Sequence, residues 1–577
     1  MQTDDRDIGH NKASQIYALL ATDPKGAWAE TRRTLKAFPS SERVRFVSGL
    51  VNIARGKKQD ARKDFAKCIK MGTPGPDAYL NLAQLSSDTR QMDFALDVLD
   101  RAERKFPGDL SVLIARIHML RAAGDVESAL QAAGAALAQD PNAPEALFLR
   151  GILLEENGQL LDAISALEAL LELHPNHAIA MVNLGRFYAF SNQSDKAIKV
   201  TERAYSIAPN LPVVLQNLAI RQRETGDFPQ AAQTFRQLMS LSSEFGPDSL
   251  RQLADLVAPE ELDALSRQID QAEAAGCPPA LREHLEFARV TIAKRAKDDP
   301  QYVTSVLRAN RLAAKHRPYD SKADSQFHTA IRDSYRAESP SVISPATQAL
   351  LPATPIFIVG LPRSGTTLLE RMLSQGDGVA GLGEVALFNR FIGKRLMTGT
   401  SITDALPELR QAYAGFQSAV GPARWTVDKM PANYAHLGWI NTAMPEARII
   451  LLRRDIRDVA LSMFENYFDD PGQNFTFEEQ RIQHRIQLFE KTIADWRALG
   501  AEFLESHYED LVQSPEATLR SITDYCDLPF DPEMLNPAEN TAAIRTVSST
   551  QARQSVNTKS VARWERYSEL LPKVFGP

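Results

Sequence analysis

The chain has little of several features that assign a protein to a class at once. Its 577 residues include three cysteines, too few and too scattered for a disulfide framework or a zinc site. It has no run of roughly 18 apolar residues, so we expect no membrane span. Residues 1–7 are polar and acidic with no apolar run behind them, which argues against a secretory signal peptide. These absences favour a reducing, cytoplasmic location.

Neither sign of charge dominates the composition. The 66 lysines and arginines against 72 aspartates and glutamates give a formal net charge of −6. That balance argues against a general nucleic-acid partner and leaves room for local basic clusters. A hydrophobic content of 44% and a charged content of 24% are ordinary for a globular protein. The length predicts two or more domains.

A period of 34 residues organises the chain over about residues 40–240. Such a period is typical of repeated pairs of amphipathic helices. Small residues are expected where the two helices approach closely, glycine or asparagine in the turn between them, and proline at the start of the next pair. The recurring residues are Pro107, Pro141, Pro175 and Pro209, Ala61, Ala95, Ala129, Ala163, Ala197 and Ala231, Gly49, Ala83, Gly151, Gly185 and Ala219, and, in the turns, Gly56, Gly124, Gly158 and Gly226. Ile117 breaks the series of small residues, and Arg90 and Asn192 take the place of the turn glycine.

This pattern resembles the tetratricopeptide repeat and implies an all-α solenoid over residues 40–240, with a helical cap over residues 1–39. Two interpretations stay open, namely a spacer or oligomerisation arm, and a concave surface that holds a peptide or protein. The sequence does not name that ligand or an oligomeric state. Residues 241–345 are predicted to form a helical bridge and, in the Ser/Pro-rich stretch 338–345, a linker.

The most specific local signal is an anion-binding loop. The sequence predicts a buried strand over residues 355–359, a tight glycine loop and a helix from Thr366, which points backbone N–H groups and a helix N-terminus at one anion. Gly360 and Gly365 nearly match the nucleotide-triphosphatase motif, but Thr366 replaces its lysine and Arg363 adds a cation inside the loop. We therefore expect a phosphate-like ligand that is not held in the usual ATP or GTP manner.

Residues 346–577 alternate strand-like and helix-like patterns, which predicts an α/β domain with a mostly parallel sheet. A second strand is expected at residues 447–452, leading into a basic loop with Arg454, and a third near residues 502–505. Ligands of such sheets bind at the carboxyl ends of the strands. The glycine loop and the Arg454 loop are therefore expected at one edge.

Two motifs in this domain resemble the sulfotransferases that use 3′-phosphoadenosine-5′-phosphosulfate (PAPS). They are Pro-Arg-Ser-Gly-Thr-Thr at residues 362–367 and Arg454 followed eight residues later by Ser462. The likeness is to tyrosylprotein sulfotransferases and to bacterial sulfotransferases fused to tetratricopeptide repeats, and it covers about residues 354–570. It implies transfer of a sulfonate from PAPS to an acceptor hydroxyl, in a bacterial cytoplasm.

The resemblance also implies how the co-substrate is held. A sulfonate carries less charge than a γ-phosphate, so no metal is expected. Arg454 and Ser462 supply a guanidinium fork and a hydroxyl for the 3′-phosphate. The residues implied at the 5′ end are Pro362, Arg363, Ser364, Gly365, Thr366 and Thr367, and those implied elsewhere on the nucleotide are Tyr508, Ser560 and Arg563.

Three residues are implied in the chemistry. Glu384 resembles the catalytic glutamate of tyrosylprotein sulfotransferases and is expected to take the acceptor proton. Lys429, with Arg363, is expected to stabilise charge on the transferring group, although Met430 departs from the acid that follows this lysine in the family. Plain structural interpretations stay open, with Glu384 and Arg454 as charges at helix starts and Lys429 as a surface lysine.

The acceptor stays open among a protein, a glycan, a lipid and a small hydroxyl compound. Residues 385–388 lack the arginine expected after the catalytic glutamate of tyrosylprotein enzymes. Asn433 and His436, expected on one helix, could line the acceptor pocket. The alternative function is a repeat-based interaction scaffold with a nucleotide-binding but inactive domain. A P-loop kinase is a third, which the missing lysine argues against.

Overall fold

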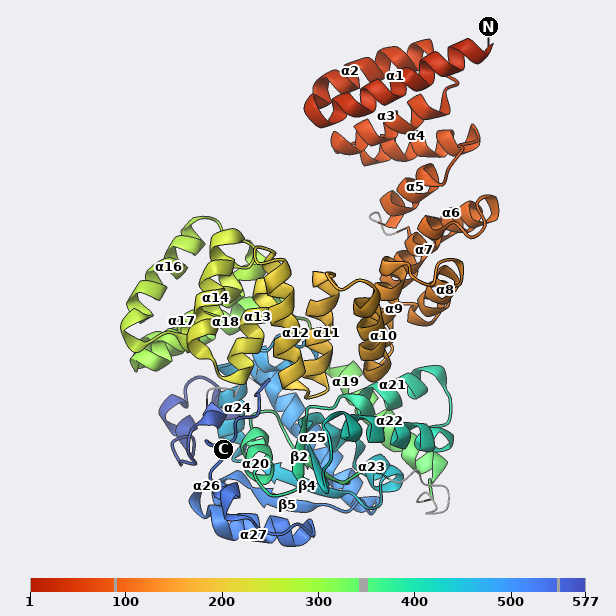
Figure 1. Ribbon diagram of the computed structural model, residues 1–577. Helices are drawn as coiled ribbons and strands as arrows, with labels where there is room; N and C mark the ends of the chain where they lie inside the picture. The colour runs from red at the N-terminus through yellow and green to blue at the C-terminus, as the bar shows by residue number, and fades with distance from the viewer. Residues whose placement is uncertain (1, 88–90, 342–350, 547–550, 576–577) are drawn as a thin grey trace. The chain divides into compact units, whose positions relative to one another are not determined.

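The computed structural model describes residues 2–87, 91–341, 351–546 and 551–575, so residues 342–345 of the predicted linker lie outside the described part. The chain divides into two compact units, Met1–Pro175 and Asn176–Pro577. The first unit is a series of paired helices (Figure 1). They are α1 (Gln2–Thr22), α2 (Pro24–Ala37), α3 (Glu42–Ala54), α4 (Lys58–Lys70), α5 (Asp77–Ser87), α6 (Met92–Lys105), α7 (Leu110–Ala122), α8 (Val126–Gln139), α9 (Pro144–Glu156) and α10 (Leu160–Leu173).

Small residues in the first unit lie where paired helices touch, as the 34-residue period predicts. A Cβ atom added to Gly49 would lie 2.5 Å from the Phe65 ring, and one added to Gly151 would lie 2.6 Å from the Leu167 side chain. Both positions therefore let two helices approach more closely than a larger residue allows. The alanines of the period in this unit, Ala61, Ala95, Ala129 and Ala163, are fully buried.

The turns between paired helices use left-handed backbone. Gly56, Gly124 and Gly158 have φ values of 70°, 80° and 84°. Glycine adopts this conformation without the Cβ clash that other residues meet. The second unit continues the pattern, with Gly226 at 92° and Asn192 at 56°.

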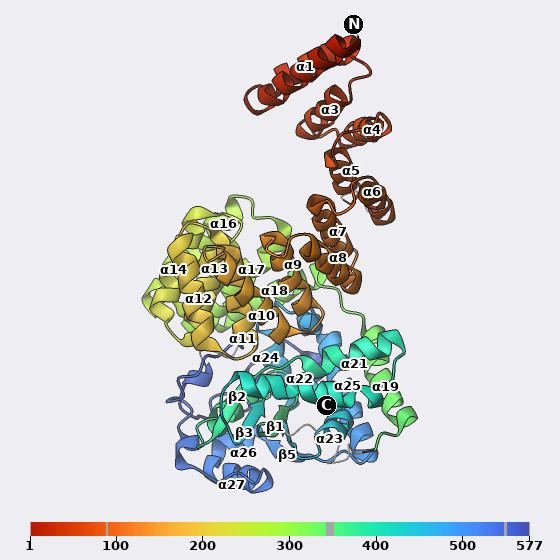
Figure 2. The ribbon, with the colours of Figure 1, turned by 45° about the vertical axis from the view of Figure 1, so that its right-hand side comes forward.

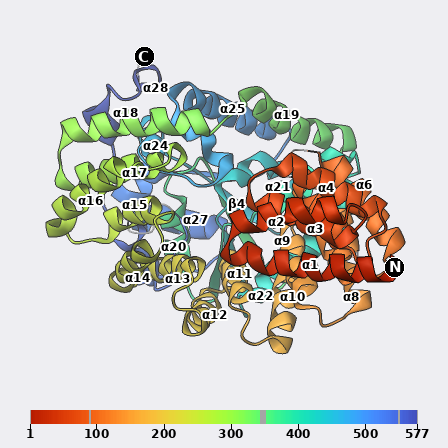
Figure 3. The ribbon, with the colours of Figure 1, turned by 90° about the horizontal axis from the view of Figure 1, so that it is seen from above.

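The second unit begins with repeat-like helices and a helical bridge. Consecutive helices of its repeat part pack on one another (Figure 3). Gly185 again allows close approach, because a Cβ atom there would lie 2.4 Å from the Thr201 hydroxyl. The α-helices are α11 (Ala178–Phe190), α12 (Ser194–Ile207), α13 (Pro212–Thr225), α14 (Phe228–Leu241), α15 (Gly246–Leu256), α16 (Leu262–Ala274), α17 (Arg282–Ala296), α18 (Asp299–His316) and α19 (Ser321–Glu338).

A five-stranded parallel sheet forms the core of the α/β part, which confirms the predicted fold class. Its order is β2-β3-β1-β4-β5; Figure 2 labels β1, β2, β3 and β5, and Figure 1 labels β4. The strands are β1 (Thr354–Val359), β2 (Val379–Gly383), β3 (Trp425–Asp428), β4 (Arg448–Arg453) and β5 (Leu504–His507). The predicted strands correspond to β1, β4 and β5, and β2 and β3 were not predicted.

The chain order makes β1 the switch point of the sheet. β1 pairs with β3 on one side and with β4 on the other, so the loops after β1 and β4 leave the same carboxyl edge. Helices surround the sheet, and α19 and α25 lie side by side (Figure 3). The α-helices of this part are α20 (Thr366–Leu373), α21 (Leu387–Thr398), α22 (Leu406–Ala419), α23 (Leu437–Ala443), α24 (Ile456–Phe464), α25 (Glu479–Ala498), α26 (Tyr508–Gln513), α27 (Pro515–Tyr525) and α28 (Pro572–Phe575).

Apolar side chains on the strands build the core beneath this edge. Ile356, Ile358, Val427 and Ile450 are fully buried and pack with side chains of α20 and α27. No helix within the described residues is both long enough and apolar enough to cross a membrane.

Candidate functional site

The loop between β1 and α20 requires both of its glycines. A Cβ atom on Gly360 would lie 2.6 Å from the backbone carbonyl oxygen of Leu452 in β4. Gly365 has φ of 97°, and a Cβ atom there would lie 2.3 Å from the Tyr508 ring. Neither contact leaves room for a side chain, so the loop lies tightly against β4 and Tyr508.

The structure brings the glycine loop and the Arg454 loop together. Arg363 donates from Nε to the Ser462 hydroxyl at 2.9 Å. Arg454 donates from Nη1 to the backbone carbonyl of Arg363 at 3.0 Å. Ser462 lies on α24, the helix after β4, so the adjacency of β1 and β4 explains the contact. Two motifs about 90 residues apart in sequence thus form one surface.

This surface has the electrostatic character of an anion site. Burial lowers the pKa of Arg363 to about 10; Glu465 opposes that shift, and the nearby Arg454 and Arg563 add to it. Arg363 also has φ of 71°, an uncommon conformation for a residue with a side chain. Cations crowded in a desolvated place are stabilised by an anion, so the charge pattern suits a phosphate or sulfonate group.

Two buried polar atoms at this surface lack a hydrogen-bond partner within the described residues. They are the Ser364 hydroxyl oxygen, in a side chain that is almost fully buried, and Nε of Arg454. A buried donor without a partner is costly, and an anion accepts such hydrogen bonds. The residues present therefore fit a phosphate-bearing ligand. Thr366 and Thr367, both buried, open α20 beside them.

Tyr508 packs under the loop. Its ring lies against Gly365, and the Arg454 guanidinium lies 4.6 Å from the ring centroid. This distance is within the range of a cation–π contact. Tyr508 therefore holds two parts of the surface in place, and its side chain is 8% exposed.

The C-terminal segment reaches the same surface through other protein groups. Arg454 donates from Nη2 to the backbone carbonyl of Ser560 at 2.6 Å. Arg563 forms an ion pair with Glu465, with Nη1 donating to Oε1 at 2.9 Å. The Lys294 amine at 2.9 Å and the Tyr302 hydroxyl at 2.5 Å also donate to Glu465. Pro362 lies in the loop itself, half-buried.

Glu384 is aimed by an irregularity at the end of β2. The pairing of β2 with β3 shifts register between Gly381 and Gly383, which is a β-bulge. Gly383 has φ of 68°, and its carbonyl accepts from the Lys429 backbone N–H at 2.8 Å. The bulge turns Glu384 onto Lys429, and the Lys429 amine donates to the Glu384 carboxylate. Glu384 is 40% exposed at its side chain and Lys429 is 2% exposed.

A third carboxylate lies close to this pair. Oε2 of Glu370, on α20, is 4.0 Å from the Lys429 amine. Burial raises the pKa of Glu370; the Lys429 charge opposes that shift, and the Glu384 charge adds to it. Two carboxylates around one buried amine are a setting in which a proton can be exchanged.

A cavity of about 70 Å³ joins these groups to the glycine loop. Sequence reasoning gave Asn192 only a place in a repeat turn and missed most of the other residues around the cavity, among them Glu370 and Arg545. Arg545 lies more than 150 residues from Glu384, and Glu370 sits inside an ordinary helix pattern, so no local signal could have found them. The residues around the cavity are Asn192, Thr367, Glu370, Arg371, Ser374, Gly381, Gly383, Glu384, Lys429, Asn540, Ala542, Ala543, Ile544, Arg545 and Thr546.

Asn433 and His436 are not among these residues. They lie on a 3-10 helix, Pro431–His436, where an ordinary helix was expected. Both side chains are about 1% exposed, and their polar atoms have no hydrogen-bond partner within the described residues. Burial lowers the pKa of His436 to about 3, so this imidazole stays neutral at pH 7.

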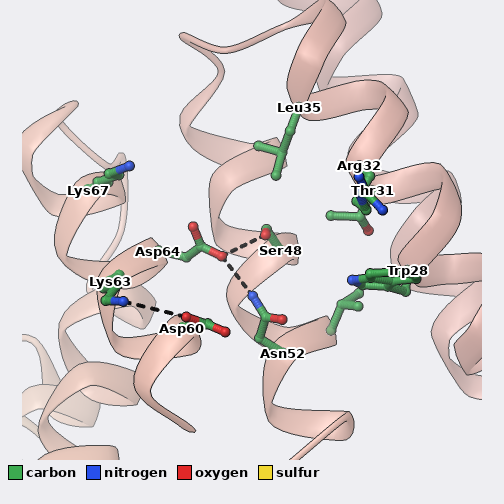
Figure 4. Close-up of a pocket in the computed structure, with 11 residues that line it drawn as sticks. Trp28, Thr31, Arg32, Leu35, Ser48, Asn52, Asp60, Lys63, Asp64 and Lys67 are labelled. Carbon is green, nitrogen blue, oxygen red and sulfur yellow. Dashed lines mark hydrogen bonds and ion pairs between the residues drawn. The ribbon is translucent and has the colours of Figure 1, made fainter. Parts of the chain in front are cut away.

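A separate pocket of about 280 Å³ lies in the first unit between α2, α3 and α4 (Figure 4). Its carboxylate Asp64 accepts hydrogen bonds from Ser48 at 2.6 Å and Asn52 at 3.0 Å, and also from Arg45 at 3.1 Å. These bonds tie α3 to α4. We therefore assign this carboxylate to the fold and place the candidate site in the second unit.

Comparison with known proteins assigns families to both parts of the chain. Residues 355–532 match the sulfotransferase family, and residues 115–166 and 150–212 match the tetratricopeptide repeat. The solved structure of YrrB, a tetratricopeptide repeat protein, is 21% identical and covers 30% of this chain and 88% of its own, with a TM-score of 0.26.

Relatives are found in animals and in a bacterium. A putative protein-tyrosine sulfotransferase of Caenorhabditis briggsae is 28% identical over 36% of this chain and 80% of its own length. Protein-tyrosine sulfotransferase 1 of Danio rerio is 25% identical over 36% of this chain and 65% of its own. An uncharacterised protein of Aquifex aeolicus is 25% identical over 60% of this chain, which spans 48% of that relative. The second part of this chain is therefore a sulfotransferase-family domain, and it follows tetratricopeptide repeats.

Proposed function

We propose that the protein transfers a sulfonate from PAPS to an acceptor hydroxyl. The observation that carries this proposal is the joint surface of the glycine loop and the α24 helix, where Arg363 bonds Ser462 and Arg454 bonds the loop backbone. PAPS has an anionic group at each end of its ribose. Two basic motifs that meet at one sheet edge suit that spacing better than a single loop does.

In this proposal the glycine loop and the start of α20 hold the 5′-phosphosulfate. The unpartnered Ser364 hydroxyl and the backbone N–H groups at the helix start are the donors. Arg454 and Ser462 take the 3′-phosphate, with Tyr508 supporting Arg454 from below. Ser560 and Arg563 act from the second layer, since the structure ties them to Arg454 and Glu465.

The chemical step needs a base and stabilised charge. The acceptor oxygen forms a new bond to sulfur, and the bond between sulfur and the 5′-phosphate oxygen breaks. The acceptor proton passes to the Glu384 carboxylate, and adenosine 3′,5′-bisphosphate (PAP) leaves with the electron pair of the broken bond. Lys429 and Arg363 stabilise the negative charge that moves toward the leaving group. Lys429 also orients Glu384, to which it donates in this structure.

The acceptor is a hydroxyl on a protein, a glycan or a small compound, and the repeats recruit it or a partner protein. The animal relatives are named for protein tyrosine, which makes a tyrosyl peptide the first acceptor to test. Repeats of this kind support peptide binding on their concave face.

Isothermal titration calorimetry with PAP and with ATP tests the donor assignment. We expect PAP to bind at least about tenfold more tightly than ATP, because only PAP offers a 3′-phosphate to Arg454. Transfer from ³⁵S-labelled PAPS to a tyrosyl peptide, a chitooligosaccharide and p-nitrophenol then tests the activity. Tight ATP binding with no PAP binding would overturn the proposal.

A further inference from the structure

Two turn positions of the repeat series carry a residue other than glycine, Arg90 and Asn192, and the turn at Asn192 reaches the candidate site. Arg90 lies outside the described residues. The matching turn positions Gly56, Gly124, Gly158 and Gly226 carry glycine, whereas the turn between α11 and α12 carries Asn192. Asn192 keeps the left-handed conformation, with φ of 56°. Glycine is the residue that adopts this conformation most readily, and asparagine tolerates it with a side chain attached. The asparagine side chain is therefore what distinguishes this turn.

That side chain bonds the bulge that precedes Glu384. Asn192 donates from Nδ2 to the backbone carbonyl of Gly381 at 2.6 Å. Gly381 is the residue at which the register of β2 shifts against β3. A bulge leaves backbone groups outside the regular ladder of hydrogen bonds, and an amide side chain can satisfy one of them. Asn192 thus supplies a bond that the sheet itself does not.

The amide of Asn192 lies at ordinary contact distance from the Cβ positions of both glycines of the bulge. A Cβ atom on Gly381 would lie 3.8 Å from Nδ2 of Asn192, and one on Gly383 would lie 3.6 Å from its Oδ1. The amide therefore lies along the backbone from Gly381 to Gly383, and Glu384 follows directly. Asn192, Glu384 and Lys429 line the same cavity.

Two further hydrogen bonds join the repeat helices α11 and α13 to residues 544 and 545, which line the cavity. Arg545, which also lines the cavity, donates to the backbone carbonyl of Ala189 at the end of α11. The backbone N–H of Ile544 donates to the carbonyl of Glu224, in α13, at 2.9 Å. The turn after α11 therefore borders the cavity through Asn192. The end of α13 holds Ile544, which also lines the cavity.

We propose that Asn192 is a positioning residue: it holds the β2 bulge and thereby aims Glu384 into the cavity that both residues line. The inference rests on the proposed function, because it takes Glu384 as the base. In this inference the α11–α12 repeat is part of the active site. A spacer or an oligomerisation arm would not contribute a residue to that site. The bond to Gly381 fixes the backbone three residues before Glu384. It therefore limits how far the Glu384 carboxylate can move.

Asn192→Gly is the sharpest test, since glycine keeps the left-handed turn and removes only the amide. We expect kcat for sulfonate transfer to fall about tenfold, because misplacement of a reacting group is costly. The Kd for PAP should change less than about twofold, because the donor site lies on the other motif. Gly124→Asn is the matched control, since Gly124 has φ of 80° and open space around its Cβ position. The control should leave kcat and Kd unchanged.

Asn192→Asp adds a readout that a merely structural residue would not move. It places a further carboxylate beside Glu384, whose charged surroundings are Lys429, Glu370, Arg371 and Arg545. A like charge raises the pKa of a carboxyl group, so the acidic limb of the pH–rate profile should move to higher pH. The assay uses ³⁵S-labelled PAPS with whichever of the tyrosyl peptide, the chitooligosaccharide and p-nitrophenol wild type sulfonates fastest.

Hydrogen exchange gives a second readout that needs no acceptor. In Asn192→Gly the amides of residues 381–386 should exchange at least about tenfold faster than in wild type, and those of residues 360–367 should not. Unchanged kcat, or unchanged exchange at residues 381–386, overturns the inference while PAP binding by wild type still supports the proposed function. If wild type neither binds PAP nor transfers the sulfonate, the proposed function itself fails.

Discussion

Glu384 carries the clearest prediction for a single residue. Replacing it with glutamine keeps the size of the side chain and an oxygen for Lys429, and it removes the proton acceptor. We expect sulfonate transfer to fall by about 100-fold or more, within the range for loss of a general base. Kd for PAP, measured by calorimetry, should stay within about threefold. Full transfer by Glu384→Gln would instead assign the proton to another group.

Arg454 and Arg457 form a natural pair for testing the 3′-phosphate site. Arg454→Lys keeps a positive charge and removes the fork that bonds the loop backbone and the Ser560 carbonyl. We expect PAP to bind about tenfold or more weakly, because a lysine does not reproduce planar, two-pronged recognition. Arg457 pairs with Asp455 at 2.6 Å and lies over Trp564. Arg457→Lys should therefore change the calorimetric Kd by less than about twofold, and equal losses in both variants would contradict the assignment.

The sequence predicted those site residues that lie in a motif next to a strand end. Arg363 and Arg454 each follow a predicted strand within a few residues, so local pattern and position agree. Glu384 follows β2, which was not predicted, and was expected only from the family resemblance. Asn192 and Arg545 reach the cavity only through packing between segments far apart in the chain. Local patterns do not carry that information, and the departure from glycine at Asn192 did not single it out, because Arg90 departs at an equivalent turn position.

Among the strands, β1 and β4 were predictable from a strong apolar pattern, and the four-residue β5 was predicted near residues 502–505, whereas β2 and β3 were missed. β1 and β4 are six-residue strands with runs of buried Ile, Leu and Val, which is typical of a strand covered on both faces. β3 has four residues, and β2 holds two glycines, which lack the side chains that mark a strand. Gly381 and Gly383 weaken the strand pattern of β2, and the same two glycines form the bulge before Glu384.

Glu465 ties four elements together, and its removal should weaken all of them. This buried carboxylate at the end of α24 is bonded by Lys294 of α17, Tyr302 of α18 and Arg563 of the C-terminal segment. Glu465→Gln leaves two partly buried cations, Lys294 and Arg563, without the charge of their buried partner, so we expect the free energy of unfolding to fall by about 3 kcal/mol. Glu490→Gln, which removes a half-exposed partner of Arg453, is the control and should cost less than about 1 kcal/mol. Chemical denaturation measures both.

The same carboxylate predicts part of the pH dependence of stability. Burial alone would raise the pKa of Glu465, but the Arg563 and Lys294 charges hold it well below its usual value. The folded chain therefore keeps this group ionised at a pH where the unfolded chain, with a pKa of about 4.3, takes up a proton. Its contribution is complete above that pH and is lost as the pH falls through the lower, folded-state pKa. Between about pH 5 and 3 the stability of Glu465→Gln should fall less steeply than that of wild type.

At the scale of the whole molecule, the repeat helices and the sulfotransferase-family domain of the second unit are joined by several contacts. Lys294 and Tyr302 of the helical bridge complete the Glu465 cluster, and Asn192 and Glu224 of the repeat helices bond Gly381 and Ile544 of the sulfotransferase-family domain and its C-terminal segment. A fragment of residues 176–577 keeps all of these contacts, whereas a fragment of residues 346–577, the predicted domain, keeps none of them.

We expect the longer fragment to bind PAP within about threefold of the full chain. The shorter one should lose cooperative unfolding, because it leaves the Glu465 cluster and the β2 bulge without their partners. Calorimetry measures PAP binding by the two fragments, and thermal unfolding measures their stability. A stable 346–577 fragment that binds PAP would contradict this prediction and show that the domain folds without the bridge and repeat helices.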